Sequence, residues 1–391
     1  KDYFQSSLYI RDSIKLKKII KKIFAQIENN KDTLHVLSKK FDINLNKINL
    51  KKFNKFQSVV LIGMGGSALG AEAIYYFLKP KIKKNFYFFD NLDQLKIVNV
   101  KKKLNKKSNL FIIISKSGNT LETLINSNLF EDKINCENTI IITENKKNLL
   151  STLAKKKNIL HIHHKNYIGG RYSVLSEVGM IPAHFMGLKI NNFRKNLLSF
   201  FESKKKLNLI DSIVKLSHIY NSKKINSIIL LNYAPELEKF LFWCQQLMAE
   251  SLGKNGVGIL PVISSVPRDH HSLLQLYLDG PKDKLFYIFS LKHNKEIKTN
   301  KNMFGDFFKY AANKKLSKII NAQKKAVIQT LKHRKIPYRV FEINSLDEAV
   351  LGELFSHFML ETVLVGNLIG INPFNQPSVE NVKILTKKYL S

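Results

Sequence analysis

The sequence is poor in cysteine, proline and glycine, and each shortage excludes a class of protein. Its two cysteines, Cys136 and Cys244, cannot form a disulfide framework and lack the spacing of a zinc site. Seventeen glycines and nine prolines among 391 residues exclude a collagen-like or low-complexity chain. No apolar run approaches the ~18 residues of a membrane span, and residues 1–30 contain no apolar signal-peptide core. These features predict a cytoplasmic protein that does not associate with membranes.

Arginine is also scarce, at six residues against 58 lysines, although the net charge is +34. A charge of this size first suggests a partner such as nucleic acid. Proteins that read bases and phosphates favour the forked guanidinium of arginine, and here the lysines are spread along the chain. We therefore interpret the charge as a solvated surface that attracts anionic metabolites, with nucleic-acid binding as the less favoured alternative.

Short apolar runs alternate with longer amphipathic stretches over most of the chain. The runs predict strands, because residues buried on both faces of a parallel sheet are continuously apolar. They lie at residues 59–62, 86–89, 110–114, 139–142, 160–162, 227–231, 258–263, 285–290 and 338–343. The amphipathic pattern predicts helices near residues 7–50, 67–78, 192–221, 236–252, 306–334, 347–370 and 378–390.

This alternation predicts an α/β fold with two domains, each a mainly parallel sheet flanked by helices, and helical segments at both ends of the chain. The predicted units are an N-terminal helical segment at 1–50, a first domain at 51–190, a second domain at 191–345 and C-terminal helices at 346–391. Ligands of open α/β sheets bind beyond the carboxyl ends of the strands. The loops that follow the predicted strands are therefore the first candidates for a site.

Two of these loops have the composition of anion-binding sites. Gly-Met-Gly-Gly-Ser at residues 63–67 lies between a strand and a helix, where glycines let a ligand approach the backbone. Ala68 replaces the third glycine of the strict dinucleotide fingerprint, so a dinucleotide site and a plain tight turn both stay open as alternatives. Ser-Lys-Ser-Gly-Asn-Thr at residues 115–120 combines hydroxyl groups, an ammonium group and a helix N-terminus. That combination predicts a phosphate cradle without a metal.

Three further segments supply charged or proton-transferring side chains. Arg171 follows two glycines, and its guanidinium suits a phosphate, a carboxylate or a developing enolate. Glu250 lies near the C-terminal end of a predicted helix, four residues after Gln246 on the same face. A carboxylate there is electrostatically disfavoured, which suits a general base. His270 and His271 open another helix and suit proton transfer, although each of these residues alone also fits a structural role.

Paired histidines also raise the question of a metal. Neither this pair nor the histidines within residues 161–164 have cysteine or carboxylate partners at ligand spacing, so the sequence predicts no metal centre. Asn-Pro-Phe-Asn-Gln-Pro at residues 372–377 leads into the last predicted helix, which contains Lys383. Among so many lysines, Lys383 has no claim to a role from its chemistry alone.

Together, six blocks of the sequence resemble the phosphoglucose isomerase (glucose-6-phosphate isomerase) family, in the family's own order. The blocks are residues 62–67, 115–123, 169–173, 246–254, 269–275 and 371–383. Each block alone is weakly specific, whereas six in order are highly specific. The resemblance implies two sugar-isomerase (SIS-type) domains, a homodimer and a place in cytoplasmic carbohydrate metabolism. It also implies reversible aldose-ketose isomerisation of glucose 6-phosphate and fructose 6-phosphate, with no cofactor and no metal.

The resemblance further implies a role for each matching residue. Glu250 moves a proton between C2 and C1 of the sugar, and Arg171 stabilises the cis-enediolate that forms. His271 and Lys383 assist ring opening, with His271 reaching the site from the neighbouring subunit. The substrate-binding residues implied are Gly66, Ser67, Ser115, Lys116, Ser117, Thr120, Gln246 and Gln376.

Two alternatives within this resemblance stay open. The phosphate-loop sequence at 117–120 is closer to the bifunctional phosphoglucose/phosphomannose isomerases, although Ser272 and Leu273 stand where that branch usually carries Asn-Glu. A non-catalytic sugar-phosphate-binding protein is less favoured, because the base and both ring-opening residues are present. The family usually has glutamine where His270 stands, so the sequence leaves a choice between His270 and His271 if the loop is shifted.

Overall fold

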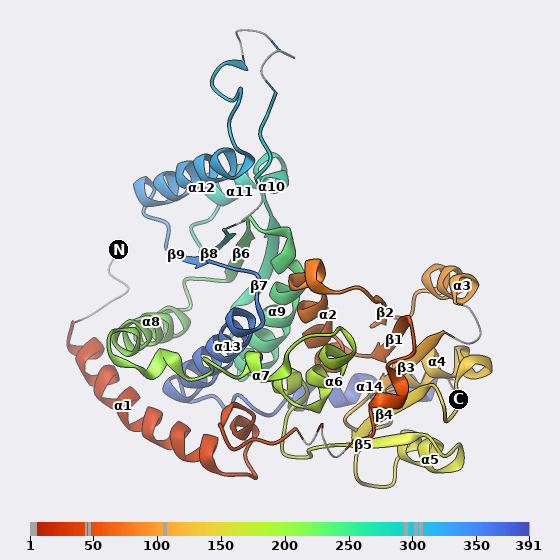
Figure 1. Cartoon of the computed structure of the whole chain (residues 1–391). Helices are drawn as coiled ribbons and strands as arrows, with labels where there is room; N and C mark the ends of the chain where they lie inside the picture. Colours follow the sequence, from red (N-terminus) through yellow and green to blue (C-terminus); the bar gives the residue numbers. More distant parts are fainter. Residues whose placement is uncertain are drawn as a thin grey trace.

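Two parallel sheets organise the computed structural model, which describes residues 6–43, 45, 48–104, 108–292, 296–300, 304 and 308–390 (Figure 1). The first sheet has the strand order β2-β1-β3-β4-β5, built from Ser58–Gly63 (β1), Asn85–Phe89 (β2), Asn109–Ile114 (β3), Thr139–Glu144 (β4) and Leu160–His164 (β5). The second has the order β7-β6-β8-β9, built from Ser227–Asn232 (β6), Leu260–Ser265 (β7), Lys284–Leu291 (β8) and Tyr338–Ile343 (β9). The sheets fall on either side of residue 190, and the exact domain limits stay a prediction.

Helices connect the strands and close both ends of the described chain. Up to residue 193 they are Ser6–Glu28 (α1), Leu69–Phe77 (α2), Gln94–Lys103 (α3), Leu121–Leu129 (α4), Leu149–Lys156 (α5), Glu177–Phe185 (α6) and Ile190–Phe193 (α7). After it they are Ser203–Ser222 (α8), Glu238–Leu252 (α9), Arg268–Ser272 (α10), Leu274–Asp279 (α11), Leu316–His333 (α12), Glu348–Leu368 (α13) and Glu380–Leu390 (α14).

Strand β1 shows why the strands read as continuous apolar runs. Val59 and Leu61 belong to the central hydrophobic core, whereas Val60 and Ile62 belong to a separate core on the other face of the sheet. Successive side chains of a strand point to opposite faces, so a strand buried on both faces has no polar alternation. Strand β6 alternates in the same way between the central core and the outer core of the second sheet.

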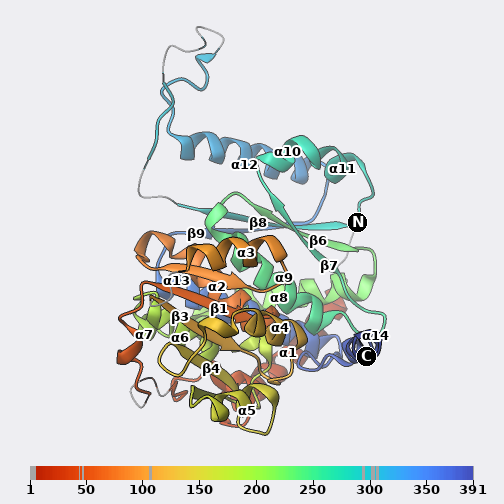
Figure 2. The same cartoon turned by 90° about the vertical axis from the view of Figure 1, so that its right-hand side faces the viewer.

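The central core lies between the two sheets and is filled by α2, α9 and α13 (Figure 2). Trp243 of α9 packs edge-on against Phe355 of α13, with ring centroids 4.8 Å apart. Gly352 of α13 permits close packing elsewhere, because a Cβ there would lie 1.9 Å from the Phe193 carbonyl oxygen. The two sheets therefore share one continuous core, which holds their loops in a defined arrangement.

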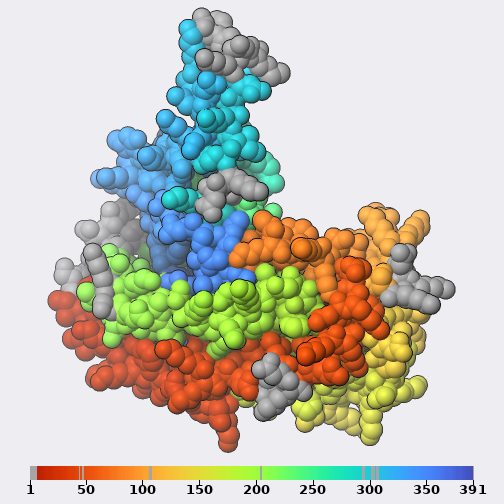
Figure 3. Space-filling view, viewed as in Figure 1, coloured from red at the N-terminus to blue at the C-terminus, as the bar shows by residue number. Residues whose placement is uncertain are grey.

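Other helices cover the outer faces of the sheets. Val100 of α3 and Leu150 of α5 belong to the outer core of the first sheet, and Tyr277 of α11 and Leu331 of α12 to that of the second. Between β8 and α12 the chain projects away from this body (Figure 3). In its described part, the two segments of the projection are tied by the Thr299 N–H, which donates to the Lys314 carbonyl at 3.0 Å.

Helix α13 is long and apolar enough, by length and composition, to cross a membrane, contrary to the expectation that no run approaches this length. In this fold 72% of its apolar window is buried. Its apolar surface is therefore covered by α1, α7, α8 and α9.

All nine predicted strands are present, but three predicted helices are shorter than expected. Helix α1 ends at Glu28, where an Asn29 side chain bonded to Asp32 forms a turn, and only short 3-10 turns follow in the described residues up to 53. The 192–221 helix begins at Ser203, and the 306–334 helix begins at Leu316. Asn313 has a φ of +56°, which is incompatible with a continuous helix, and residues 306 and 307 lie outside the described part.

Candidate active site

A polar cavity of about 350 Å³ lies at the carboxyl ends of the strands of the first sheet. Six segments of the chain line it: the loops after β1, β3 and β4, the loop before α6, the end of α9, and the C-terminal segment. The lining residues are Met64, Gly66, Ser67, Lys116, Ser117, Thr120, Glu144, Lys146, Gly170, Arg171, Gln246, Glu250, Gln376, Glu380 and Lys383. Ten of the twelve residues that the sequence singles out are therefore brought together.

The loop after β1 owes its shape to the close approach of another loop. Gly66 lies in a short 3-10 turn, Gly65–Ser67 (η4), and faces Gly170 at the start of the turn Gly170–Leu175 (η7). A Cβ on Gly66 would lie 2.3 Å from the carbonyl of Gly170, so no larger residue fits without moving the backbone. The contact of these two loops brings Arg171 to the edge of the cavity.

The loop after β3 is held by hydrogen bonds among its own hydroxyl groups. Ser115 and Thr120 share one at 2.9 Å, and the Gly118 N–H donates to Ser115 Oγ at 3.1 Å. Ser115 is only 2% exposed and lies beneath the loop, whereas Lys116, Ser117 and Thr120 line the cavity. The predicted contact of Ser115 with substrate thus stays a prediction, while its support of the loop is visible.

Asn148, the N-cap of α5, packs under the same loop. Gly118 has a φ of +67°, and a Cβ there would lie 1.9 Å from Asn148 Oδ1. The Leu149 N–H donates to Asn119 Oδ1 at 3.1 Å, and the Leu150 N–H donates to the Gly118 carbonyl at 3.2 Å. The loop after β4 therefore fixes the loop after β3, as expected for neighbouring strands of one sheet.

Arg171 is the central connector of the site. It is 3% exposed, and all five of its N–H groups have acceptors. Nε donates to Ser251 Oγ at 2.8 Å, Nη1 to Glu250 Oε2 at 3.1 Å and to Gln376 Oε1 at 2.7 Å. Nη2 donates to the carbonyls of residues 373 and 375, at 2.7 and 3.1 Å. One guanidinium thus joins α9 to the segment that precedes α14.

Glu250 lies two residues before the end of α9, and Gly253 caps that end. Both carboxylate oxygens are engaged, since Gln246 Nε2 donates to Oε1 at 2.8 Å and Arg171 binds Oε2. The side chain is 32% exposed, so the carboxylate still faces the cavity. A carboxylate held by a cation and an amide in a polar cavity has the geometry of a general base.

The C-terminal segment forms the remaining wall. Lys383 Nζ donates to Glu380 Oε1 at 2.6 Å, and both side chains line the cavity from α14 while staying largely exposed. Lys254 Nζ donates to the carbonyls of Ser251 and Asn372, at 3.0 and 2.6 Å. Burial lowers the pKa of Lys254 to about 8. Lys254 and Arg171 together tie this wall to α9.

His271 does not line this cavity. It is exposed on α10, which lies on the second sheet. The neighbouring His270 is partly buried, its Nε2 lies 2.9 Å from the Tyr233 hydroxyl, and burial lowers its pKa. Of the two histidines, His271 is therefore the one whose side chain is exposed to solvent, and the expected contribution from a neighbouring subunit stays a prediction.

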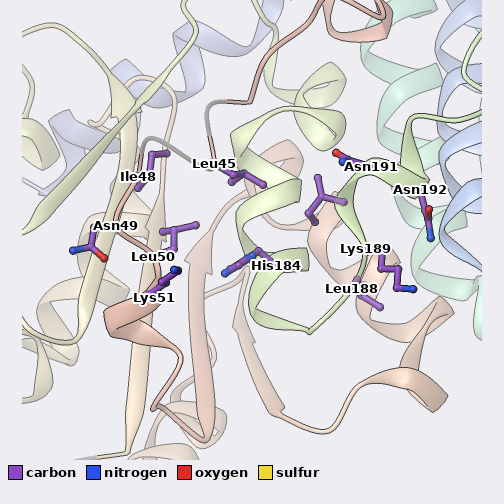
Figure 4. A pocket seen from close by; sticks show the side chains of 11 residues that line it. Leu45, Ile48, Asn49, Leu50, Lys51, His184, Leu188, Lys189, Asn191 and Asn192 are labelled. Atoms are coloured by element: carbon purple, nitrogen blue, oxygen red, sulfur yellow. The ribbon is translucent and has the colours of Figure 1, made fainter.

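A larger cavity, of about 860 Å³, lies elsewhere, between the segment before β1 and the turn that joins α6 to α7 (Figure 4). The described residues that line it include Lys51, His184 and Lys189 but no carboxylate. It contains none of the residues that the sequence singles out. The smaller polar cavity, which contains ten of them, is therefore the candidate active site. Within the described ranges, no cluster of three or more histidine, cysteine, aspartate or glutamate side chains suits a metal ion.

Comparison with known proteins bears directly on this cavity. The phosphoglucose isomerase family profile matches residues 11–391. The chain belongs to the phosphoglucose isomerase family. It is 34% identical to the glucose-6-phosphate isomerase of Methanocaldococcus jannaschii over 355 residues, covering 88% of this chain and 86% of that protein. It is 32% identical to that of Mycoplasmopsis pulmonis over 389 residues, covering 89% and 88%.

Solved structures of phosphosugar isomerases share this fold. A glucose-6-phosphate isomerase from Chlamydia trachomatis superimposes with a TM-score of 0.73 at 20% identity, covering 87% of this chain and 70% of that one. A tagatose-6-phosphate ketose/aldose isomerase from Escherichia coli gives a TM-score of 0.53 at 16% identity, covering 86% and 88%. The SIS-type α/β fold and the family that the sequence predicts are thereby confirmed.

Sequence reasoning missed two charged residues of the cavity, Glu144 and Lys146. Neither lies in a block that resembles the phosphoglucose isomerase family. The rule that ligands bind at the carboxyl ends of strands would have found them, because Glu144 ends β4 and Lys146 follows two residues later. Their proximity to Lys116 follows from the pairing of β3 with β4.

Proposed function

We propose that this chain interconverts glucose 6-phosphate and fructose 6-phosphate through a cis-enediolate. The observation that carries the proposal is that Glu250 and Arg171 share one cavity with the hydroxyl and ammonium groups of the 115–120 loop. A general base and a fixed cation at one end, with a phosphate cradle at the other, are what isomerisation of a sugar phosphate needs. The volume of about 350 Å³ is within the range of about 300–1,000 Å³ typical of small-molecule sites.

The phosphate binds to Lys116, Ser117 and Thr120 at the N-terminus of α4. Hydroxyl groups, an ammonium and the positive end of a helix suit the three phosphate oxygens. Ser115 acts from beneath, by holding the Thr120 hydroxyl. Binding of this remote group orients C1 and C2 against Glu250, so binding energy is converted into a lower barrier for the chemical step.

Glu250 removes the proton from C2 and returns it to C1. Negative charge develops on the enediolate oxygens during this step, and the buried Arg171 guanidinium stabilises it. Because every Arg171 N–H already has an acceptor, Arg171 acts as a fixed charge beside the base. A substrate oxygen that accepts a hydrogen bond from Arg171 Nη1 displaces the side-chain oxygen of Gln376, Oε1. Gln376 lies in the exposed wall of the cavity.

Ring opening precedes this step and needs a proton transfer at O1 and O5. Lys383 supplies the ammonium within the cavity, held by Glu380. His271 comes from the neighbouring subunit of a homodimer, which agrees with its exposure on α10 and with its absence from the cavity lining. The sugar is contacted by Gly66, Ser67, Gln246 and Gln376. No cofactor takes part in the reaction. The enzyme works in the cytoplasm.

A coupled assay with fructose 6-phosphate tests the proposal, and formation of glucose 6-phosphate without added metal or cofactor is the expected result. No turnover would overturn it. Mannose 6-phosphate in the same assay tests the bifunctional alternative, which the Ser-Gly-Asn-Thr sequence of the phosphate loop favours. Turnover of both substrates at comparable rates would assign the chain to that branch.

A further inference from the structure

Glu144 and Lys146 lie at the end of the cavity where the 115–120 loop binds phosphate. Glu144 Oε1 lies 3.8 Å from Lys116 Nζ, and Glu144 Oε2 forms an ion pair with Lys146 Nζ. The Glu144 side chain is 9% exposed, whereas that of Lys146 is 61% exposed. One buried carboxylate thus holds two ammonium groups at the rim of the phosphate site.

The backbone around Glu144 is fixed on both sides. Its N–H donates to the Lys116 carbonyl at 3.2 Å, and its own carbonyl accepts from Asn148 Nδ2 at 3.4 Å. Lysine side chains have flexible four-carbon stems, so they take their positions from what they bind. Glu144 is therefore the fixed point, and the positions of Lys116 and Lys146 depend on it.

The charge balance at this end favours an anion. Lys116 faces Glu144, Lys146 and His164, and burial lowers the pKa of His164 to about 4, which leaves it neutral at neutral pH. Two ammonium groups then face one carboxylate, so the set keeps a net positive charge. A buried carboxylate alone would repel a phosphate dianion, and its presence here is explained by the lysines that it holds.

We propose that Lys146 is a second phosphate-binding ammonium group and that Glu144 is a positioning residue for Lys146 and Lys116. The inference rests on the proposed function, because it assigns the phosphate of the sugar phosphate to this end of the cavity. The exposed Lys146 side chain turns from Glu144 to the phosphate as substrate enters. Lys116, deeper in the site, keeps its place beside Glu144.

Lys146→Gln and Lys147→Gln form a matched pair that tests whether Lys146 binds the phosphate. Both remove one exposed positive charge, but Lys147 does not line the cavity. Calorimetric titration with inorganic phosphate should give a Kd about tenfold higher for Lys146→Gln and within about twofold of the parent for Lys147→Gln. KM for fructose 6-phosphate should rise in the same order, and kcat should fall with it because the phosphate orients the reacting carbons. Lys146→Arg should restore both. Equal effects of the two substitutions would overturn the role of Lys146.

Glu144→Gln tests the positioning role of Glu144 by whether phosphate binding becomes weaker or tighter. Removal of a negative charge should tighten phosphate binding if Glu144 were a bystander, whereas loss of a positioning residue weakens it. Burial lowers the pKa of Lys116, whereas the negative charge of Glu144 raises it. Without that charge Lys116 should lose its proton at a lower pH. The variant should therefore lose phosphate affinity at a lower pH than the parent, on titration from about pH 8 to about pH 10. Tighter binding across this range would refute the positioning role.

The two proposals fail in distinguishable ways. A parent protein without isomerase activity, in which Lys146→Gln still weakens binding of inorganic phosphate, would remove the proposed function and keep the phosphate site. An active isomerase in which Lys146→Gln and Lys147→Gln bind phosphate equally would keep the function and remove this inference. Circular dichroism of each variant checks that the fold is retained.

Discussion

Arg171 donates a hydrogen bond of 3.1 Å to Glu250, and this contact joins the turn Gly170–Leu175 to the end of helix α9. The same guanidinium binds Gln376 at 2.7 Å, so three segments of the chain meet at one side chain. Because its donors are all engaged, Arg171 needs little reorganisation when charge develops beside it. The position of the carboxylate is therefore determined by the tertiary fold.

Replacement of Glu250 by glutamine should nearly abolish turnover. The amide keeps the size of the side chain but cannot accept the C2 proton, and loss of a general base typically costs about 10²–10⁴-fold in rate. Steady-state kinetics with fructose 6-phosphate should show this fall in kcat with KM little changed. Glu238→Gln, an exposed site at the start of α9, serves as the control. Retention of more than about a tenth of the parent rate would exclude Glu250 as the base.

The double substitution Ser117→Ala and Thr120→Ala should both raise KM and lower kcat. These hydroxyl groups bind the phosphate, and the phosphate orients the reacting carbons, so binding and chemistry weaken together. The measurement is a substrate titration for parent and variant. Kinetics identical to those of the parent would show that the 115–120 loop does not contact the substrate.

Mixing two inactive variants should restore activity if the site is shared between subunits. Glu250→Gln and His271→Ala dimers, reassembled at equal amounts, form mixed dimers in which one site carries both lesions and the other carries neither. About half of the dimers are mixed, so activity should recover to roughly a quarter of the parent value. Mixed dimers that form, as measured by native mass spectrometry, yet stay inactive would place both residues in one chain.

Arg171→Lys should lower stability as well as activity. Lysine cannot reproduce the fork that binds Ser251, Gln376 and two carbonyls, so buried acceptors lose their donors. The expected loss is about 3 kcal/mol in the free energy of unfolding, measured by urea denaturation. Arg268→Lys, at an exposed arginine, should leave that free energy nearly unchanged. Equal stability of both variants would mean that the C-terminal wall holds its place without Arg171.

The free energy of unfolding should decrease as the pH is lowered from about 6.5, and part of this decrease should come from His164. Burial lowers the pKa of His164 from 6.5 to about 4. Between these values the unfolded chain binds a proton that the folded chain does not, so the free energy of unfolding decreases as the pH falls. The contribution is up to about 3 kcal/mol, fully present above pH 6.5. Urea denaturation at several pH values should show a smaller decrease for His164→Gln, and parallel curves would contradict the assignment.

The sequence by itself determined the strands and the family, and it singled out ten of the residues that line the cavity. Runs such as 59–62 and 110–114 predict strands because burial on both faces removes polar alternation, and this signal is local. The 63–67, 115–120 and 169–173 motifs are also local, since each lies within one loop. Helix ends were predicted less well, as the turn at Asn29 shows, because a single side-chain hydrogen bond decides them.

The tertiary structure alone decided how these loops meet. No local signal connects Glu144 to Lys116, because their contact depends on the pairing of β3 with β4. The five partners of Arg171 come from α9 and the C-terminal segment, which only the shared core of the two sheets brings together. Sequence patterns record the environment of each residue along its own helix or strand, whereas distances between separate elements follow from packing, and it is packing that assembles this cavity.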